Sequence, residues 1–386
     1  MPALPDWKFK SPNLVSFGYG VVNEIGDHLK KLKAASCLVV TDPGLVAVGL
    51  VEKVMEPLAS AGIAATLFSE VQPEPVVENV EAALSLYKAN ACQAIVGFGG
   101  GSAIDVAKAA AMLVTNPGSF QDYAGIGKVV NKGAPFIAVP TTAGTGSEVS
   151  MFSIMVVGGN KMGVVDHLTM PDVALVDPML SLSVPRKAKA ATGLDAFCHH
   201  LESFLSTNAS PFCDAICLEG IKTISENLRA AVAGPGNLDA HYGMTYASML
   251  GGYVMNLTEG AAANHGLAFA LGAKFHVPHG LSNAVLLPHV LRVVAEAEHR
   301  KIARIGEVMG LNLIGLSPVE CVDATIEAVA RLVADVGCLL PLSSLGVTEK
   351  DLDELTRSTM TQTRVMGHST YTLTPEEIRN IFAAAL

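Results

Sequence analysis

The first half of this chain alternates between two kinds of segment, and this alternation constrains the fold more than any other feature. Short runs rich in β-branched residues end in turn residues and lead into stretches with helical spacing. Such alternation predicts a parallel sheet with crossover helices, and uniformly apolar runs predict strands buried on both faces. The predicted strands are 36–41, 64–69, 94–98, 136–139, 152–157 and 173–176, and the predicted helices are 49–61, 77–89 and 103–114.

The second half lacks strand-like runs, and Pro185 interrupts the pattern where they stop. A chain of 386 residues is long enough for about two domains. We therefore predict an α/β domain over residues 1–184 and an all-α domain over residues 185–386, with no low-complexity linker between them. Ala- and Leu-rich segments with helical spacing are 188–205, 211–233, 240–256, 261–272, 284–298 and 318–336.

Charge and cysteine usage exclude several classes of protein. The net charge is −10 and only 16% of residues are charged, which is unsuited to nucleic-acid binding. The longest uncharged stretch, 242–258, falls short of the roughly 20 apolar residues of a spanning helix, and it predicts a core helix instead of a membrane segment. The first residues contain no apolar signal sequence. Seven scattered cysteines without a CxxC pair predict reduced thiols and a cytoplasmic protein.

Two segments with glycines follow predicted strands. Residues 99–102 (GGGS) precede a helix whose first N–H groups suit a diphosphate. The spacing is not GxGxxG, because Ser102 takes the third glycine position, and a plain strand-to-helix turn fits these residues too. Residues 140–148 (PTTAGTGSE) bring small hydroxyls to the same sheet edge, where α/β proteins bind ligands. The alternative there is a helix N-cap, since Thr145 and Glu148 suit a capping box.

Asp42 ends the first long strand, and its position also allows two interpretations. A carboxylate there can accept hydrogen bonds from a ribose diol and repel a 2′-phosphate. In the Rossmann pattern, however, the acidic residue follows the glycine-rich loop, whereas Asp42 precedes it. Spacing alone therefore favours a turn-forming Asp before Pro43 and Gly44.

The second half contains a candidate metal site. Asp195 and His199 are four residues apart, so on a helix they share one face and can reach one ion. An unbroken helix would hold His265 and His279 about 21 Å apart, so a shared ion requires the chain to turn back between them. Gly272 and Pro278 offer breaks. The alternative is an ordinary helix contact for the first pair and structural roles for the other two histidines.

These residues lie within motifs that resemble the iron-containing (group III) alcohol dehydrogenases along essentially the whole chain. The family's GGGSxxDxAK, PTTxGTxSE and GxDAxxHxxE segments match residues 99–108, 140–148 and 193–202. Shorter matches are FGYG at 17–20, PHG at 278–280 and LLPH at 286–289. The resemblance implies a Rossmann-like, dinucleotide-binding α/β domain and a helical metal-binding domain, as in the dehydroquinate synthase-like architecture.

The resemblance also implies the site residues and the reaction. The implied metal ligands, through which catalysis occurs, are Asp195, His199, His265 and His279, with Fe²⁺ as the usual ion and Zn²⁺ or another divalent ion in some members. The expected reaction is reversible hydride transfer between a small alcohol or aldehyde and nicotinamide C4, in a cleft between the domains of a homodimer or larger assembly. The residues implied to hold NAD are Asp42, Gly99, Gly100, Gly101, Ser102, Asp105, Thr141, Thr142 and Lys161. Asp42 matches the family position associated with preferring NAD over NADP. The resemblance therefore replaces the turn-forming role, which spacing alone favoured, with a role in cofactor binding.

The chain departs from the family pattern at two places. The segment after the third ligand often reads HGxxH, but Phe269 stands where the second His is expected, and His276 is a substitute or a structural residue. Near the C-terminus, residues 368–371 (HSTY) replace an Asn-Pro-Arg segment. Glu202, three residues past His199, either holds a metal-ligating residue in position or makes an ordinary surface or capping contact. Rival functions are a zinc polyol or glycerol dehydrogenase, another small-aldehyde reductase of the same superfamily, a dehydroquinate-synthase-like lyase, and a catalytically silent metal- and nucleotide-binding protein.

Overall fold

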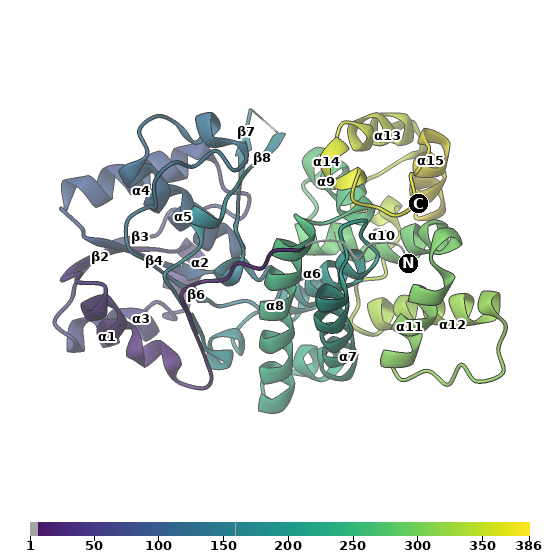
Figure 1. The fold of residues 1–386 in the computed structure, drawn as a ribbon, viewed down its shortest axis with the longest axis horizontal. Helices are drawn as coiled ribbons and strands as arrows, with labels where there is room; N and C mark the ends of the chain where they lie inside the picture. The colour runs from purple at the N-terminus through teal and green to yellow at the C-terminus, as the bar shows by residue number, and fades with distance from the viewer. Residues whose placement is uncertain (1–6, 159) are drawn as a thin grey trace. The chain divides into compact units, whose positions relative to one another are not determined.

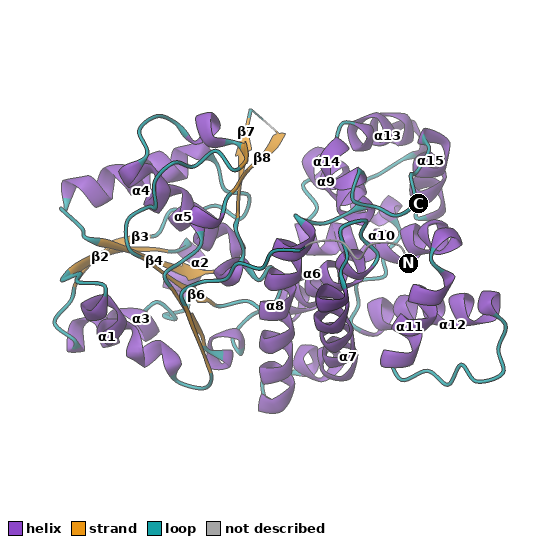
Figure 2. Cartoon of the chain, viewed as in Figure 1, coloured by secondary structure: helices purple, strands orange, loops and turns teal. Residues whose placement is uncertain are grey.

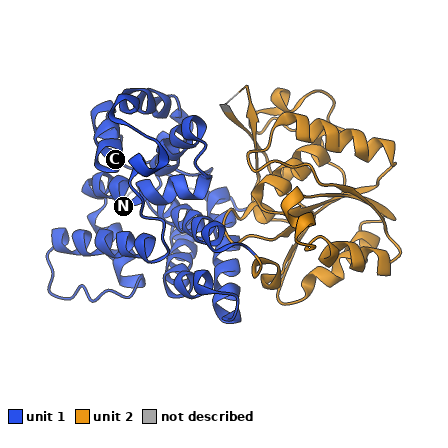
Figure 3. Ribbon diagram, turned by 180° about the vertical axis from the view of Figure 1, so that it is seen from behind, with its two compact units in different colours: residues 1–9, 184–386 blue, residues 10–183 orange. Residues whose placement is uncertain are grey.

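The computed structural model describes residues 7–158 and 160–386, and these divide into two compact units (Figure 3). One unit comprises residues 10–183, and the other comprises residues 7–9 together with residues 184–386. Trp7 stacks on Phe212 of the helical unit with ring centroids 4.6 Å apart, and Phe9 contacts the same ring edge-on. These aromatic contacts place residues 7–9 with the helical unit although they lie at the start of the chain.

The first unit is built on a six-stranded sheet in which all strand pairs are parallel (Figure 2). Parallel strands need crossover segments, and helices supply them here, so the predicted α/β architecture is confirmed. In spatial order the strands are β1 (Leu14–Phe17), β9 (Val173–Val176), β6 (Phe136–Pro140), β4 (Ala94–Gly99), β2 (Ser36–Val40) and β3 (Ala64–Phe68). The α-helices described in this unit are α1 (Ile25–Lys31), α2 (Pro43–Ala47), α3 (Glu52–Ser60), α4 (Val77–Ala89) and α5 (Gly101–Thr115). Its short 3-10 helices are η1 (Val21–Glu24), η2 (Phe120–Tyr123), η3 (Ser147–Val149), η4 (His167–Thr169) and η5 (Pro178–Ser181).

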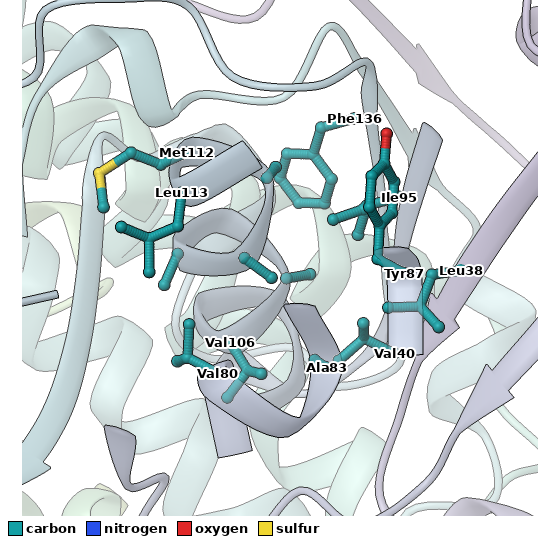
Figure 4. Close-up of a cluster of buried hydrophobic side chains, with 14 of the residues drawn as sticks. Leu38, Val40, Val80, Ala83, Tyr87, Ile95, Val106, Met112, Leu113 and Phe136 are labelled. Carbon is teal, nitrogen blue, oxygen red and sulfur yellow. The ribbon is translucent and has the colours of Figure 1, made fainter. Parts of the chain in front are cut away.

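Both faces of this sheet are buried, because helices cover each of them (Figure 1). Along β2, Leu38 and Val40 join the core beneath α4 and α5, and Figure 4 shows them in one cluster with Val80, Ala83 and Val106. Cys37 and Val39, which alternate with them, join the core beneath α1 and α3. Side chains in a strand alternate between faces, so a strand that is apolar throughout fits only a sheet covered on both sides.

The run 152–157 does form a strand, but not in the main sheet. It is β7 (Phe152–Val157), which pairs antiparallel with β8 (Asn160–Val165), and β5 (Gly125–Ile126) adds to β8. The sequence pattern did not reveal β1, β5 or β8. A hairpin forms here because β8 follows β7 almost directly, so a short turn closes the pair without a crossover helix.

The described residues of the second unit form helices joined by loops, with one isolated bridge between Ser206 and Ser369 and no β-strand (Figure 2). Its central helix α6 packs against α7, α8 and α10. Three helices begin with a capping Ser or Thr followed by proline at the first helical position: Ser210, Ser317 and Thr374 accept a hydrogen bond from a backbone N–H of the first turn. The helices are α6 (Arg186–Phe204), α7 (Pro211–Ala233), α8 (Leu238–Thr258), α9 (Ala263–Phe275), α10 (His279–Val294), α11 (His299–Val308), α12 (Pro318–Asp335), α13 (Leu352–Met360), α14 (Thr363–Met366) and α15 (Pro375–Ala384), with 3-10 turns η6 (Ala295–Ala297), η7 (Leu342–Leu345) and η8 (Glu349–Asp351).

Within the described residues, every helix is too short or too polar to cross a membrane. The uncharged stretch 242–258 lies inside α8, where Gly251 and Gly252 are buried among neighbouring helices. The apolar content of this stretch therefore contributes to the interior of the helical unit.

Candidate metal centre and cofactor edge

Three helices bring three of the four predicted metal ligands, Asp195, His265 and His279, to one point, and His199 lies beside Asp195 but outside this convergent group. Asp195 and His199 lie one turn apart on α6, His265 lies in the first turn of α9, and His279 is the first residue of α10. The Nε2 atoms of His279, His265 and His199 lie 3.5, 3.6 and 3.9 Å from Oδ1 of Asp195. Asp195, His265 and His279 offer donor atoms that all lie within 4.8 Å of one another.

The spacing of these donors fits one divalent cation. Two ligands of a tetrahedral ion at about 2.1 Å from the metal are about 3.4 Å apart, which is close to the separations around Asp195. Imidazole nitrogens with one carboxylate oxygen are a donor set that suits iron or zinc. The residues that the sequence spaced far apart therefore form a site that can hold a metal.

The chain reverses between His265 and His279 at His276. This residue ends α9 with φ of 54°, and Pro278 then precedes α10. Gly272, one of the two expected breaks, lies inside α9 instead. His276 is exposed, whereas the donors of the candidate site lie between helices.

A glycine allows α10 to approach α6 closely beside the candidate ligands. A Cβ placed on Gly280 would lie 2.3 Å from the backbone oxygen of Ala191 and 3.3 Å from Cβ of Asp195. Backbone atoms cannot yield as a flexible side chain does, so only glycine fits here. This close approach puts His279 within reach of Asp195.

The site combines buried charges of both signs. Burial disfavours the ionised form of Asp195, but the neighbouring His199, His279 and His265 outweigh this effect and hold the pKa of the carboxyl well below its usual range. Burial likewise lowers the pKa of His265, but Glu202 and Asp195 raise it more, to about 9. Asp195 and His265 are each only 2% exposed, so water does little to screen their interaction.

Glu202 supports His265 from behind. Its Oε2 contacts Nδ1 of His265, and its Oε1 accepts hydrogen bonds from the backbone N–H groups of Asn264 at 2.6 Å and His265 at 3.2 Å. A carboxylate on Nδ1 fixes the ring tautomer that presents the Nε2 lone pair to a metal. Oε1 thus caps the first turn of α9 while Oε2 holds the His265 ring, so Glu202 fills both of the roles considered for it.

Phe269 forms an apolar side of the candidate metal site. Its ring stacks on His279 with centroids 5.5 Å apart and meets His265 edge-on at 6.0 Å. His200, which follows His199, is fully buried and shares a 2.9 Å hydrogen bond with the backbone oxygen of Ala247, so it faces away from the other histidines.

Most residues expected to hold a dinucleotide meet at one edge of the main sheet. Asp42, at the end of β2, caps α2 through a 3.0 Å hydrogen bond from the Leu45 N–H to Oδ1. Gly99 ends β4 with φ of 156°, and a Cβ there would lie 2.7 Å from the Ala103 side chain and 3.6 Å from Oδ2 of Asp42. Thr141, which follows β6, donates its N–H to the Gly99 oxygen at 2.9 Å. Parallel register explains this meeting, because strand ends share one edge.

The start of α5 lies at this edge and has no side-chain cap at Gly100. A Cβ on Gly100 would contact Thr142 at 3.5 Å, and one on Gly101 would come within 2.9 Å of Thr145. The glycines thus keep backbone N–H groups accessible at the positive end of a 15-residue helix. This cradle fits the phosphates of a dinucleotide.

Ser102 and Lys161 contact one loop of the same unit. The Ser102 hydroxyl donates to the Pro73 oxygen at 2.7 Å, and the Lys161 ammonium lies 3.0 Å from the Glu74 carboxylate. The pairing with Glu74 had no signal in the sequence. It places Lys161 of β8 beside the loop that Ser102 contacts.

Asp105 has a different environment from the other expected cofactor residues. Its carboxylate accepts hydrogen bonds from the Ser147 hydroxyl at 2.5 Å and the Ile154 N–H at 3.0 Å. The fully buried Lys108, one turn later on α5, donates to the Ser147 and Ser150 hydroxyls and to the Phe152 oxygen. Together Asp105 and Lys108 fasten α5 to β7 and to the loop before it. The sequence analysis missed this role of Lys108, although its i,i+3 spacing from Asp105 was a signal.

The comparisons with known proteins cover almost the whole chain. Residues 12–178 match the family described as "Iron-containing alcohol dehydrogenase", and residues 189–386 match "Fe-containing alcohol dehydrogenase family, C-terminal". The long-chain-alcohol dehydrogenase 1 of Geobacillus thermodenitrificans is 39% identical over 377 residues, which is 97% of this chain and 95% of that protein. The 1,3-propanediol dehydrogenase of Citrobacter freundii is 40% identical over 344 residues, which is 88% of this chain and 89% of that protein.

Solved structures of similar proteins share the fold. A 1,3-propanediol oxidoreductase superposes with a TM-score of 0.96 at 35% identity, over 99% of this chain and all of that one. The sulfoacetaldehyde reductase of Bifidobacterium kashiwanohense in complex with NAD⁺ gives 0.89 at 30% identity, over 99% of both chains. Both family segments match, and Asp195, His265 and His279 form a group that can hold a metal ion, so the chain belongs to the iron-containing alcohol dehydrogenase family.

Proposed function

We propose that this protein is an NAD-dependent alcohol dehydrogenase that transfers hydride reversibly between the carbinol carbon of a small alcohol and nicotinamide C4. The observation that carries the proposal is the cluster of Asp195, His265 and His279, whose donor atoms converge in a chain of this family. The products of oxidation are an aldehyde, reduced NAD and one proton.

The proposed metal ligands are Asp195, His199, His265 and His279, with Fe²⁺ as the native ion and Zn²⁺ as the alternative. When bound, a divalent ion supplies Lewis-acid chemistry at the alcohol oxygen. One carboxylate among three neutral imidazoles leaves a 2+ ion with net positive charge, which favours a developing oxyanion. Glu202 holds His265 in the required tautomer through its contact with Nδ1.

We propose that residues 1–184 bind the cofactor, with Asp42, Gly99, Gly100, Gly101, Ser102, Thr141, Thr142 and Lys161 around it. The N-terminus of α5 attracts the diphosphate, and the Asp42 carboxylate accepts from a ribose hydroxyl and repels a 2′-phosphate. Asp105 supports this edge from within, through the hydrogen bonds described above. Residues 185–386 provide the metal site.

We propose a cytoplasmic location and a homodimer or larger assembly. The location is supported by the seven cysteines, all of which are buried and free of disulfides. Sedimentation velocity of the purified protein tests the assembly, and a monomer at micromolar concentration would contradict it.

The proposed function is tested by comparing the activity of metal-depleted protein with that of protein reloaded with a defined metal ion. Metal-depleted protein reloaded with Fe²⁺ or Zn²⁺ is assayed with NAD and NADP over a panel of primary alcohols and their aldehydes, and reduced cofactor is followed by absorbance. We expect turnover only after metal loading and preferentially with NAD. Cofactor binding without turnover on any substrate would overturn the proposal.

Variants of single ligands sharpen this test. His265→Ala and His279→Ala should each lower kcat/KM by more than about a thousandfold, because each removes a ligand of the group that stabilises charge. The exposed His299 on α11 provides a matched control, and His299→Ala should retain activity. Full activity in either ligand variant would contradict the assignment.

A further inference from the structure

Asn283 is a fully buried amide that faces three of the proposed ligands. It lies on α10 one turn after His279 and has no exposed surface. Its Nδ2 lies 2.8 Å from Oδ1 of Asp195, 3.1 Å from Nε2 of His265 and 3.4 Å from Nε2 of His279. One amide nitrogen thus contacts the donor atom of each of these residues.

The neighbouring Asn264 determines which end of the Asn283 amide faces the metal ligands. Its Nδ2 donates to Oδ1 of Asn283 at 3.1 Å and to the backbone oxygen of Asn283 at 3.2 Å. An amide oxygen only accepts and an amide nitrogen only donates. With its oxygen bound to Asn264, Asn283 must direct its N–H groups at Asp195 and the imidazoles.

We propose that Asn283 is a positioning residue of the metal site, one that assembles the ligand atoms before a cation binds; this rests on the proposed function. Electronegative atoms that converge in a buried space repel one another, and a pair of N–H donors offsets this repulsion until a cation displaces them from the single lone pair of each imidazole. The hydrogen bond to Asp195 also turns its Oδ1 toward His265 and His279 and leaves that oxygen a further lone pair for a cation.

Metal affinity of the depleted protein tests this proposal without relying on turnover. Asn283→Leu keeps a side chain of similar size and removes the donors. Competition with a chromogenic chelator for Zn²⁺, and titration with Co²⁺ followed by its d–d absorption, should show affinity weakened about 10–100-fold and an altered cobalt spectrum. Unchanged affinity together with an unchanged spectrum would overturn the proposal.

A second variant removes only the orientation of the amide. Asn264→Ala leaves every proposed ligand and Asn283 in place, and it should weaken affinity less than Asn283→Leu. The double variant should bind no more weakly than Asn283→Leu alone, because both changes act through one amide. Fully additive losses would contradict the orienting role of Asn264, and they would count against the proposal.

A matched control separates positioning from stability. Asn116, in the α/β unit, is 1% exposed and donates to the Met112 and Asn131 oxygens at 2.9 Å. Asn116→Leu should lower the melting temperature and leave Zn²⁺ affinity unchanged. If wild type binds no more Zn²⁺ than His265→Ala, the proposed function fails; if wild type binds well and Asn283→Leu binds equally well, only the role of Asn283 fails.

Discussion

Phe269 defines the chemistry of one side of the metal site. A phenyl ring stacked on His279 offers neither a donor nor an acceptor to a second substrate hydroxyl. It does offer apolar surface, and burial of one methylene is worth about 0.8 kcal/mol. We therefore expect Phe269 to favour monohydric alcohols with apolar chains over diols.

Phe269→His should reverse this preference. We expect the ratio of kcat/KM for 1-hexanol to that for 1,3-propanediol to fall about tenfold, because an imidazole can hydrogen-bond the second hydroxyl. Steady-state kinetics on metal-loaded protein measure the ratio. Phe269→Leu, which stays apolar, should keep the wild-type ratio, and an equal fall in both variants would argue against the hydrogen-bonding explanation.

Asp42 combines a structural role with the proposed choice of cofactor, and one substitution separates the two. Asp42→Ser retains an oxygen that can cap α2 at the Leu45 N–H, and removes only the charge. We expect the ratio of kcat/KM for NADP to that for NAD to rise at least tenfold, since the repulsion of a 2′-phosphate is lost. An unchanged ratio, or wild-type protein that already prefers NADP, would show that this carboxylate does not select the cofactor.

At the scale of elements, the metal site depends on how closely α10 approaches α6. The proposed ligands come from three helices, and the hydrophobic periodicity of each helix by itself does not predict a metal site. Gly280 permits the close approach of α10 to α6, because the nearest neighbour of its Cβ position is the backbone of Ala191 on α6.

Gly280→Ala should separate the two helices. We expect a loss of about 1–3 kcal/mol in the free energy of unfolding from overpacking, and weaker Zn²⁺ binding because His279 moves with α10. Chemical denaturation and chelator competition measure the two effects. Gly236 has open space around its Cβ position, so Gly236→Ala should change neither quantity. A tolerated Gly280→Ala would mean that the helices adjust without disturbing the ligands.

For the molecule as a whole, buried charge in the α/β unit gives a pH-dependent stability. Burial raises the pKa of Glu148 to about 7 from 4.5 and lowers the pKa of Lys108 to about 8 from 10.5. Between pH 4.5 and 7 the folded chain keeps a proton on Glu148 that the unfolded chain loses. Stability from this group is therefore present below pH 4.5 and declines as the pH rises to 7.

Glu148→Gln should flatten this part of the pH profile. The difference between wild type and variant in the free energy of unfolding should change by on the order of 1–3 kcal/mol between pH 4.5 and 7, since Lys108 stays protonated in both states there. Urea denaturation at several pH values measures it. Parallel profiles for the two proteins would show that Glu148 is ionised throughout this range in the folded state.

The sequence by itself determined the features that depend on local spacing. Uniformly apolar runs identified buried parallel strands, and the spacing of Asp195 and His199 put them on one helix face. The side-chain periods of two residues in a strand and 3.6 residues in a helix are set by backbone geometry, so they can be recognised in the sequence. The motifs then identified the family, which the matched family segments confirm, and they predicted the ligand residues, which stay a prediction.

Only the tertiary structure decided which distant residues touch. Asn283 and Asp195 are 88 residues apart, and nothing in the spacing of either predicts their hydrogen bond. The turn at His276, the partner of Lys161 and the antiparallel pairing of β7 likewise depend on packing against neighbours. Such contacts arise where helices and strands meet, and their energy depends on the shapes of both surfaces, which no local pattern encodes.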